Sequence, residues 1–279
     1  MSGFSAEWLS LREGVDHRAR NLDLQRQVCA HLSKTAAPRL IDLGCGSGSN
    51  LRALAPHLPS GQMWRLVDAD PALLEAARRL LSQWADEAHA DGDALRLTKS
   101  GKLIEVRFEQ ADLARDLDQV LDRAADLVTA AAFFDLVAAD WLVHFCKSVA
   151  TRQLPFYTVL TYDGVERWQP AHGADQTVLA AFHAHQATDK GFGPAAGPKA
   201  TGVMEEVFKA AGYRVSTAAS PWQLEAPRDE ALIRALAEGT AHAVSETGRV
   251  AEAQLQSWLA ARRVASHVEI GHLDFFARL

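Results

Sequence analysis

Short runs of apolar residues alternate along the chain with longer stretches in which apolar residues recur every three or four positions. The short runs are typical of strands buried on both faces, and the longer stretches have the period of amphipathic helices. This alternation favours a largely parallel sheet with helices on both faces. In the first half of the chain we predict strands at residues 39–43, 63–68, 103–109, 126–130 and 156–162.

The stretches between these strands carry the helical period. We predict helices at residues 50–57, 71–88, 113–123 and 137–150. Pro71 suits a first helical position, because its missing N–H group would have no partner within the helix. Residues 95–98, followed by the turn Lys99-Ser-Gly-Lys102, predict a hairpin that leads into the third strand.

The second half of the chain has longer intervals between its strands. After residue 164 the pattern is helical at 173–189, rich in glycine and proline at 191–198, and helical again at 199–211. Two further strands are predicted at 213–220 and 267–278, with helices at 229–239 and 250–264 between them. We therefore expect an α/β fold with a doubly wound, seven-stranded sheet, mostly parallel but with an antiparallel last strand.

A single domain is expected for residues 1–279, because a chain of this length still supports one hydrophobic core. It would begin with a helical segment at 1–38. We predict a helical lid at 165–200 after the fifth strand, and a helical insertion at 226–265 between the sixth and seventh strands.

The composition is that of an ordinary globular protein, with 48% hydrophobic and 23% charged residues. The net charge of -6 disfavours binding to a polyanion, so we expect no nucleic-acid partner. Three widely spaced cysteines indicate neither a disulfide framework nor a zinc site. The most apolar stretch contains Asp135 and Asp140, and the first residues lack the pattern of a signal peptide. We therefore expect a cytoplasmic protein, monomeric or homodimeric, without a membrane association.

The strongest local signal is the segment Leu-Ile-Asp-Leu-Gly-Cys-Gly-Ser-Gly-Ser-Asn at residues 40–50. Gly44, Gly46 and Gly48 stand between a predicted strand and a predicted helix. Glycine has no β-carbon, so such a turn can adopt positive φ angles and let a ligand approach the backbone. The N–H groups at the start of the helix would favour a carboxylate or a phosphate. The segment therefore predicts a ligand-binding turn.

An acidic residue, Asp68, stands at the end of the second predicted strand. A carboxylate at this position can accept hydrogen bonds from both hydroxyls of a ribose. Dinucleotide-binding loops have the pattern Gly-x-Gly-x-x-Gly or Ala, whereas Ser49 occupies the position of the third glycine here. We therefore favour a nucleoside ligand over a nicotinamide dinucleotide, which remains an alternative, as does a tight turn without a ligand.

Four segments together resemble the motifs of class I S-adenosylmethionine-dependent methyltransferases. Residues 40–50 resemble the first motif, and residues 64–79, which contain Asp68-Ala-Asp-Pro71, are similar to the second. Residues 108–113 resemble the turn whose acid contacts the adenine amino group, and residues 126–135 resemble the fourth-strand motif beside the methyl-transfer site. The motifs occur in the order of the family, and the resemblance covers residues 39–162 with the last two strands.

The resemblance implies S-adenosyl-L-methionine as the cofactor and S-adenosyl-L-homocysteine as the product. The glycines would surround the methionine part, Asp68 would bind the ribose, and Asp112 with Leu113 would contact adenine. Asp42 would order the turn and reach the ammonium group through water, while Arg20 would pair with the carboxylate. The full set of implied cofactor-binding residues is Arg20, Asp42, Gly44, Gly46, Gly48, Asp68, Ala69, Asp112, Leu113 and Ala130.

Several of these residues have plain structural alternatives. Asp112 could equally cap the helix that follows it. Arg18 is the next choice for the carboxylate, and both Arg18 and Arg20 fit a solvated helix face. His183 and His185 are two positions apart on a predicted helix and would face different sides, so we expect no metal site.

Methyl transfer requires that the acceptor atom, the methyl group and the sulfur lie in line and that water is excluded. If the acceptor must lose a proton, a base is needed at the carboxyl end of the fourth or fifth strand. The candidates for this catalytic role are Asp135, after the fourth strand, and Tyr162, Asp163 and His172, at or after the fifth. His172 equally fits a surface residue.

Candidate substrate contacts lie close to the same strand ends. Phe133 and Trp141 follow the fourth strand and could form a wall of the substrate pocket, although both also fit the core. Glu166 lies after the fifth strand, and it could also act as a base. Lys190 precedes the glycine-rich segment and could pair with an acidic group on the acceptor, the alternative being an exposed lysine.

These observations predict a methyltransferase that acts on a small-molecule acceptor in a pocket closed by a lid. Two alternatives remain. One is a nucleic-acid or protein methyltransferase, which the acidic net charge disfavours. The other is a methyltransferase-like regulatory protein that binds the cofactor without turnover.

Overall fold

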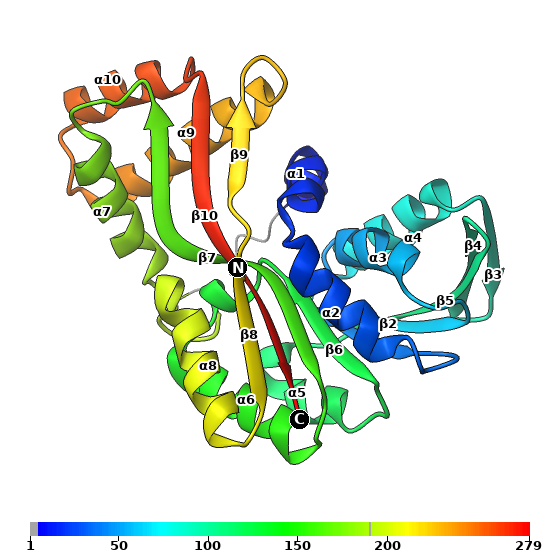
Figure 1. The fold of residues 1–279 in the computed structure, drawn as a ribbon. Helices are drawn as coiled ribbons and strands as arrows, with labels where there is room; N and C mark the ends of the chain where they lie inside the picture. Colours follow the sequence, from blue (N-terminus) through cyan, green and yellow to red (C-terminus); the bar gives the residue numbers. More distant parts are fainter. Residues whose placement is uncertain (1–4, 190) are drawn as a thin grey trace.

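The computed structural model describes residues 5–189 and 191–279, and one long twisted sheet runs through it (Figure 1). Five strands lie parallel in the order β5–β2–β1–β6–β7, and β10 and then β8 follow β7 in antiparallel pairing. The bounds of these strands are β1 Arg39–Leu43, β2 Gln62–Asp68, β5 Lys102–Gln110, β6 Leu127–Ala131, β7 Phe156–Gln169, β8 Arg214–Ala219 and β10 His267–Arg278. The predictions of an α/β fold and of an antiparallel last strand are confirmed.

Helices cover both faces of the sheet, because its central strands are apolar on both sides. One face packs against α2, α3 and α4, and the opposite face packs against α5, α6 and α8. The bounds of the helices and 3₁₀ turns are α1 Ala6–Ala19, α2 Leu22–Leu32, α3 Ser49–Leu54, η1 Ala55–His57, α4 Pro71–Trp84, α5 Leu113–Leu121, η2 Phe134–Leu136, α6 Ala139–Thr151, α7 Asp175–Gln186, η3 Gly197–Lys199, α8 Ala200–Ala210, α9 Glu230–Thr247 and α10 Glu252–Arg262.

The prediction of seven strands is wrong, because the sheet has ten strands within the described residues. β3 (Glu87–Asp91) and β4 (Ala94–Lys99) form a hairpin that extends the sheet beyond β5. The predicted helix at 71–88 therefore ends early, at Trp84, since pairing with β4 overrides the helical pattern of residues 87–91. Gly92, in the hairpin turn, has a φ of 57°, which glycine adopts without strain.

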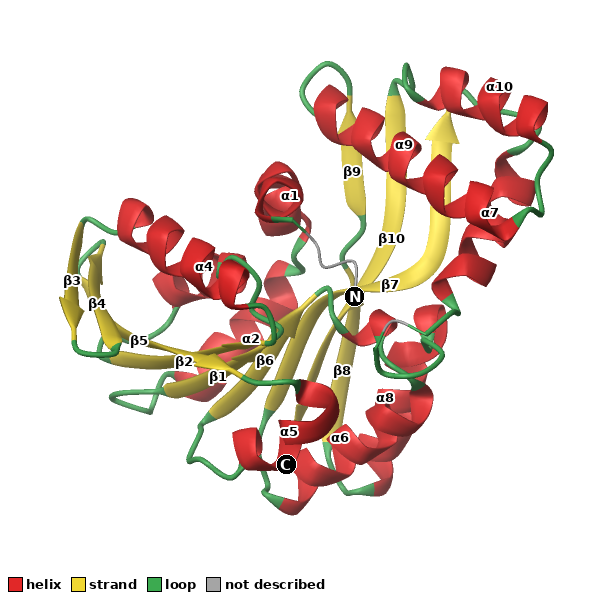
Figure 2. Ribbon diagram, turned by 180° about the vertical axis from the view of Figure 1, so that it is seen from behind, coloured by secondary structure: helices red, strands yellow, loops and turns green. Residues whose placement is uncertain are grey.

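Beyond the core, β7 and β10 stay paired and leave the main sheet together (Figure 2). β7 continues to Gln169, whereas the sequence predicted its end at 162, because residues 163–169 are too polar to be read as a buried strand. The remaining strand of the ten, β9 (Trp222–Glu225), pairs with the first residues of β10. Helices α7, α9 and α10 cover one face of this three-stranded extension.

We call this extension the upper lobe and define it as residues 163–189 and 221–271. The ranges predicted as a lid and an insertion contribute the end of β7 and helices α7, α9 and α10 to it. Helix α1 lies between the upper lobe and the parallel core (Figure 2). Within the residues that the structure describes, no helix combines the length and the apolar composition needed to cross a membrane.

Helix α1 is tied to both of its neighbours by ion pairs. Its Glu13 accepts two hydrogen bonds from the Arg52 guanidinium of α3, each 2.6 Å long. Its Arg18 donates to Asp229, directly before α9 in the upper lobe. These contacts hold α1 between the core and the upper lobe.

Candidate functional site

The glycine turn, residues 44–48, connects the end of β1 to α3. Gly44, Gly46 and Gly48 have φ angles of 60°, 52° and 79°, in the left-handed region where glycine pays no steric penalty. The N–H group of Cys45 donates to the carbonyl oxygen of Val67 (3.0 Å), which ties the turn to the end of β2. The conformation of the turn therefore depends on its glycines, and a hydrogen bond fixes the turn to the neighbouring strand β2.

Two of these glycines also lack room for a side chain. A β-carbon at Gly44 would lie 2.8 Å from Cδ2 of Phe133, and one at Gly46 would lie 3.0 Å from Cδ1 of Leu9. Phe133 follows β6, and Leu9 belongs to α1. The turn is therefore bordered closely by two segments that are distant in the sequence.

Asp68 stands at the end of β2 and faces the glycine turn. Its Oδ2 accepts a hydrogen bond from the N–H of Gly46 (2.8 Å), and its Oδ1 accepts one from the N–H of Asp70 (3.0 Å). Burial raises the pKa of this carboxyl, and the two backbone hydrogen bonds lower it. Each carboxylate oxygen has a further lone pair for a ligand. Asp70 instead caps α4 by accepting from the N–H of Ala72 (2.8 Å).

A buried polar network lies beneath the turn. Asp42 accepts a hydrogen bond from the Asn50 amide (2.6 Å), and the same amide nitrogen donates to the Thr129 hydroxyl oxygen (3.1 Å). Burial raises the pKa of Asp42 to about 7, although the Asn50 hydrogen bond and the positive charge of Arg20 lower it. The protonation of Asp42 therefore responds to any charge placed beside it.

Several buried polar atoms around the turn have no hydrogen-bond partner among the described residues. Folded proteins rarely leave such atoms unpaired, because burial without a partner costs free energy. Arg20, directly after α1, is only 5% exposed, whereas Arg18 is engaged by Asp229. The unpaired atoms are Arg20 Nε and Nη1, Asp42 Oδ2, Ser47 Oγ and Asn50 Oδ1.

At the predicted adenine edge, Asp112 is the N-cap of α5. Its Oδ1 accepts from the N–H of Ala114 and its Oδ2 from Nε of Arg115, both at 3.0 Å. The carbonyl oxygen of Leu113 accepts a hydrogen bond from the Trp141 indole (3.0 Å). The capping role that the sequence left open for Asp112 is therefore present in the structure.

An aromatic wall of Phe133, Trp141 and Phe192 lies over the end of β6. The ring of Phe133 contacts Trp141 edge-on at 5.9 Å and Phe192 at 5.7 Å between centroids. Phe192 belongs to the glycine-rich segment 191–198, and the N–H of Ala196 in that segment donates to the carbonyl oxygen of Val137 (2.7 Å). This segment therefore closes onto the aromatic residues that border the glycine turn.

The other predicted binding residues have simpler surroundings. Ala130 is fully buried within β6. The carbonyl oxygen of Ala69 accepts a hydrogen bond from the side chain of Gln110 (3.2 Å). Lys190, predicted to contact the substrate, lies outside the described residues.

Asp135, Tyr162, Glu166 and His183 form a second group, which we call the β7 cluster. The Tyr162 hydroxyl donates to Oε1 of Glu166 (3.2 Å) and lies 2.9 Å from Nε2 of His183. Burial raises the pKa of Asp135 to about 6, while a hydrogen bond from the Tyr162 backbone N–H lowers it. Burial likewise raises the pKa of Glu166 to about 7 and lowers the pKa of His183. The cluster therefore holds several groups that can exchange protons near neutral pH.

Of the other two predicted catalytic residues, His172 lies apart from this cluster, whereas Asp163 directly follows Tyr162 and its charge acts on the Tyr162 hydroxyl. His172 precedes α7, and its Nδ1 accepts from the N–H of Ala174 (3.2 Å), so it sits at the opposite end of the helix from His183. Oδ1 of Asp163 accepts from the N–H of Val165 (2.9 Å), and its carboxylate lies against β10. A β-carbon at Gly271 would lie only 2.1 Å from Oδ1 of Asp163.

The structure adds residues that the sequence did not indicate. Arg12 of α1 bonds Asp16 (2.8 Å) and lies 5.5 Å from the ring of Trp222 on β9. The ring of Trp222 lies 5.1 Å from that of His272 on β10, and burial lowers the pKa of His272 to about 3. Arg12, Trp222, His272 and His183 come from four separate elements. No local pattern in the sequence could therefore predict that they lie in the same part of the structure.

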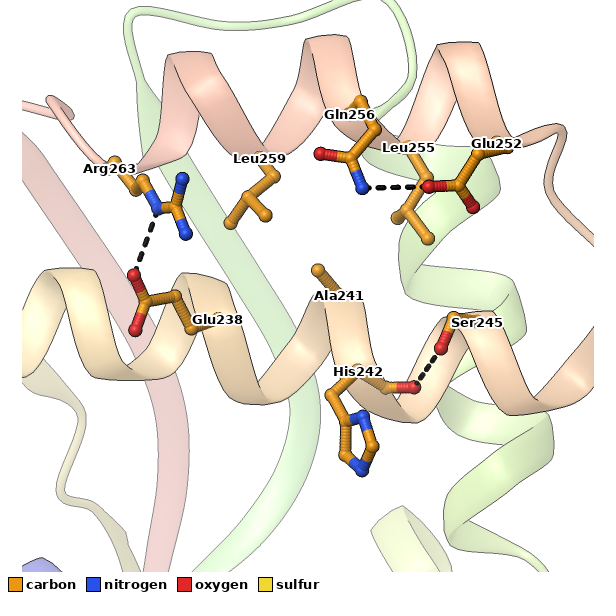
Figure 3. A pocket seen from close by; sticks show the side chains of 9 residues that line it. All are labelled: Glu238, Ala241, His242, Ser245, Glu252, Leu255, Gln256, Leu259 and Arg263. Carbon is orange, nitrogen blue, oxygen red and sulfur yellow. Dashed lines mark hydrogen bonds and ion pairs between the residues drawn. The ribbon is translucent and has the colours of Figure 1, made fainter.

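A groove of about 490 Å³ runs between α9 and α10 in the upper lobe (Figure 3). Ala241, Leu255 and Leu259 point into it, and an ion pair between Glu238 and Arg263 (2.9 Å) crosses one end. None of its lining residues belongs to the glycine turn or to the β7 cluster. We therefore place the candidate active site at the glycine turn and the β7 cluster rather than in this groove.

No protein-family model and no curated protein matches the chain. Among solved structures, it is similar to a cyclopropane-fatty-acyl-phospholipid synthase-like protein from Lactobacillus casei, with 14% identity over 98% of this chain and 94% of that one and a TM-score of 0.54. A magnesium protoporphyrin IX methyltransferase from Synechocystis with bound S-adenosylhomocysteine is 11% identical over 100% and 90% of the two chains, with a TM-score of 0.49.

A further match is a methyltransferase from Thiobacillus denitrificans in complex with S-adenosyl-L-homocysteine, 14% identical over 98% of each chain, with a TM-score of 0.45. At these identities the similarity concerns the fold. The Lactobacillus casei structure therefore shares its α/β fold with this chain, in agreement with the observed strand order.

Proposed function

We propose that this protein is a methyltransferase that binds S-adenosyl-L-methionine at the glycine turn and acts on a small molecule. The observation that carries this proposal is the set of buried, unpaired polar atoms around the turn, above all those of the Arg20 guanidinium. A buried guanidinium pairs best with a carboxylate, which it can bind through two parallel hydrogen bonds. An amino-acid ligand brings such a carboxylate to the turn.

The residues around the turn fit the chemical groups of this cofactor. Arg20 would pair with its carboxylate, and Asp42, whose Oδ2 is unpaired, would accept from its ammonium group directly or through water. Asp68 would accept from the ribose hydroxyls with its free lone pairs. Leu113 would border the adenine ring. When bound, S-adenosyl-L-methionine supplies an electrophilic methyl group on a sulfonium.

The contribution of the chain is to orient the reactants and to keep water away. Leu9 and Phe133 pack on the glycine turn from two sides, and Phe192 packs on Phe133. The β7 cluster lies next to this wall, since Asp135 follows Phe133 by two positions. We assign the methyl acceptor to the space beside the β7 cluster, between α1 and the upper lobe.

A small-molecule acceptor is favoured over a macromolecule by two observations. Leu9 of α1 packs on the glycine turn, and Phe192 of segment 191–198 packs on the Phe133 beside it, which favours an acceptor small enough to fit between these side chains. The net charge of -6 also disfavours a nucleic acid.

Calorimetric titration of the purified chain tests cofactor binding. We expect S-adenosyl-L-methionine and S-adenosyl-L-homocysteine to bind and nicotinamide adenine dinucleotide not to bind. Asp68→Asn should weaken binding about tenfold through loss of a charged acceptor, which corresponds to about 1.4 kcal/mol. The matched control is Asp70→Asn, because Asp70 stands two positions away and caps α4.

Binding of the dinucleotide alone would overturn the proposal, and so would equal effects of the two substitutions. Turnover is tested by incubating the protein with methyl-labelled cofactor and a small-molecule extract. Transfer of label to a small compound supports the enzyme, whereas tight cofactor binding without any transfer supports a regulatory protein.

A further inference from the structure

The β7 cluster contains a chain of hydrogen bonds whose direction can be assigned. Burial raises the pKa of Glu166 to about 7, so at pH 8.5 its carboxylate is ionised and only accepts hydrogen bonds; the single proton of the Tyr162 hydroxyl then points to Glu166 Oε1, 3.2 Å away. Glu166 Oε2 also receives the Trp168 indole N–H at 3.5 Å. The oxygen of Tyr162 is then left to accept from Nε2 of His183, at 2.9 Å. This order fixes which nitrogen of His183 carries the proton.

A neutral histidine whose Nε2 carries the proton has its lone pair on Nδ1. Burial lowers the pKa of His183, which keeps the ring neutral at pH 7. Burial and the negative charge of Glu166 raise the pKa of Tyr162, so its hydroxyl stays protonated. His183 is therefore presented as a base with a single free nitrogen.

The titratable groups around this ring come from three elements besides α7. Tyr162, Asp163 and Glu166 belong to β7, and the negative charges of the two acids act on the Tyr162 hydroxyl. Asp135 comes from η2 and acts on it as well. His272 of β10 lies 6.2 Å from the Tyr162 ring, and its own lowered pKa keeps it uncharged. A fourth element, α1, adds the positive charge of Arg12, which acts on Asp135 and on His272, whereas burial is what lowers the pKa of His183.

His183 stands on the side of the upper lobe that meets the segment 191–198. A β-carbon at Gly164 would lie 2.9 Å from Pro198 and 3.7 Å from Cε1 of His183. Tyr162, which holds the ring, is joined through its backbone N–H to Asp135, and Asp135 follows the Phe133 that packs on Gly44. A short path of contacts therefore runs from the glycine turn to His183.

We propose that His183 takes the proton from the methyl acceptor, with Tyr162 and Glu166 as positioning residues that keep Nδ1 free. This inference rests on the proposed methyltransferase function. In the step, the O–H or N–H bond of the acceptor breaks, its electron pair stays on the acceptor atom, and a new N–H bond forms at Nδ1. The imidazolium then releases this proton to solvent, which restores the neutral ring.

The test is a measurement of the tautomer of His183 by two-dimensional NMR of protein labelled with ¹⁵N-histidine, with the signal assigned through His183→Gln. We expect one neutral form with the proton on Nε2 at pH 8.5, where Glu166 is ionised, both in the free protein and with S-adenosyl-L-homocysteine added. Tyr162→Phe should convert this single tautomer into a mixture. Glu166→Gln should preserve it, because the amide oxygen still accepts from Tyr162.

The matched control is His185→Gln, since His185 lies on the same helix but pairs with Glu246 of α9 (2.9 Å). This change should leave the His183 signal as it is. A proton on Nδ1, or a charged ring, at pH 8.5 in the unmodified protein would overturn the inference even if Tyr162→Phe does not fold. Failure of S-adenosyl-L-homocysteine to bind would instead reject the proposed function and leave the tautomer result intact.

Discussion

The glycine turn and Asp68 come from one strand–helix–strand unit, whereas the β7 cluster draws Asp135, Tyr162, Glu166 and His183 from three elements. In the first region, the proposed function depends on backbone geometry, because three glycines hold left-handed angles. In the second region it depends on side chains that meet only after the upper lobe has formed. A substitution in the first region should therefore affect ligand binding, while one in the second should affect proton exchange or stability.

The largest effects are expected from two glycine-to-alanine substitutions, one in the glycine turn and one in the upper lobe beside the β7 cluster. Gly44→Ala would add a β-carbon 2.8 Å from Phe133 at a φ of 60°. The positive φ costs about 1–2 kcal/mol and the overlap about 1–3 kcal/mol, so we expect about a 100-fold loss of S-adenosyl-L-homocysteine affinity with the fold retained. Calorimetry, with circular dichroism for the fold, measures this.

Gly271→Ala should behave in the opposite way. Its β-carbon would lie 2.1 Å from Oδ1 of Asp163, in the strand pair that carries the upper lobe. We expect the free energy of unfolding in urea to fall by about 1–3 kcal/mol, with cofactor affinity changed less than threefold. If Gly271→Ala lost binding as strongly as Gly44→Ala, the two regions would not be separable.

The next largest effect is expected at the end of α1. Arg20→Leu removes a buried cation that the proposal pairs with the cofactor carboxylate, and loss of a charge-assisted hydrogen bond costs about 1.5–3 kcal/mol. S-adenosyl-L-homocysteine should therefore bind about 10- to 100-fold more weakly. Arg18→Leu serves as the control, because Arg18 contacts Asp229 instead. Similar losses in both variants would contradict the assigned role of Arg20.

A smaller effect is expected in the pH dependence of stability, to which both regions contribute. Burial raises the pKa of Asp42 and of Glu166 to about 7 in the folded protein. The folded state thus keeps protons that the unfolded chain releases near pH 4, so stability should fall as the pH rises toward 7 and level off above it. The effect is on the order of 1–3 kcal/mol between pH 5 and 7.

Urea unfolding at a series of pH values checks this sign. Asp42→Asn should flatten the slope in part and leave the share that comes from Glu166. A stability that rises between pH 5 and 7 would show that the two buried carboxyls are ionised in the folded state.

The smallest effect is expected on the outer face of the upper lobe. Arg263 and Glu238 form an ion pair across the groove of Figure 3, and both side chains are 47% exposed. Exposed pairs of this kind contribute little, so Arg263→Ala should change the free energy of unfolding by less than about 0.5 kcal/mol. Cofactor affinity should stay the same, whereas any loss would connect this groove with the active site.

The two regions also differ in how far the sequence could predict them. The strand ends at Asp42 and Asp68 and the glycines between them are set by neighbours along the chain, so their pattern could be read directly. The extension of β7 could not, because residues 163–169 are mostly polar and become a strand only by pairing with β10. The same reason explains β3, whose pairing with β4 replaces the end of a predicted helix, whereas the hairpin of β4 and β5 was predicted from residues 95–102.

Within the candidate site, the sequence predicted roles in catalysis or substrate binding for Asp135, Tyr162 and Glu166, but none for His183. Its position beside His185 suggested only that the two rings face different sides. The hydrogen bond from His183 to Tyr162 depends on where α7 lies on β7, which is a property of the folded lobe. Asp112 shows the converse, because its local capping role was visible in the sequence and is present in the structure.

The continuous pairing of β7 and β10 has a mechanical consequence. The upper lobe is carried by these two strands rather than by a flexible tether, and their register shifts only between Ile270 and His272 and between Leu273 and Phe275. A β-bulge locally bends its strand, so we expect any change in the angle between the upper lobe and the core to be concentrated at those two positions.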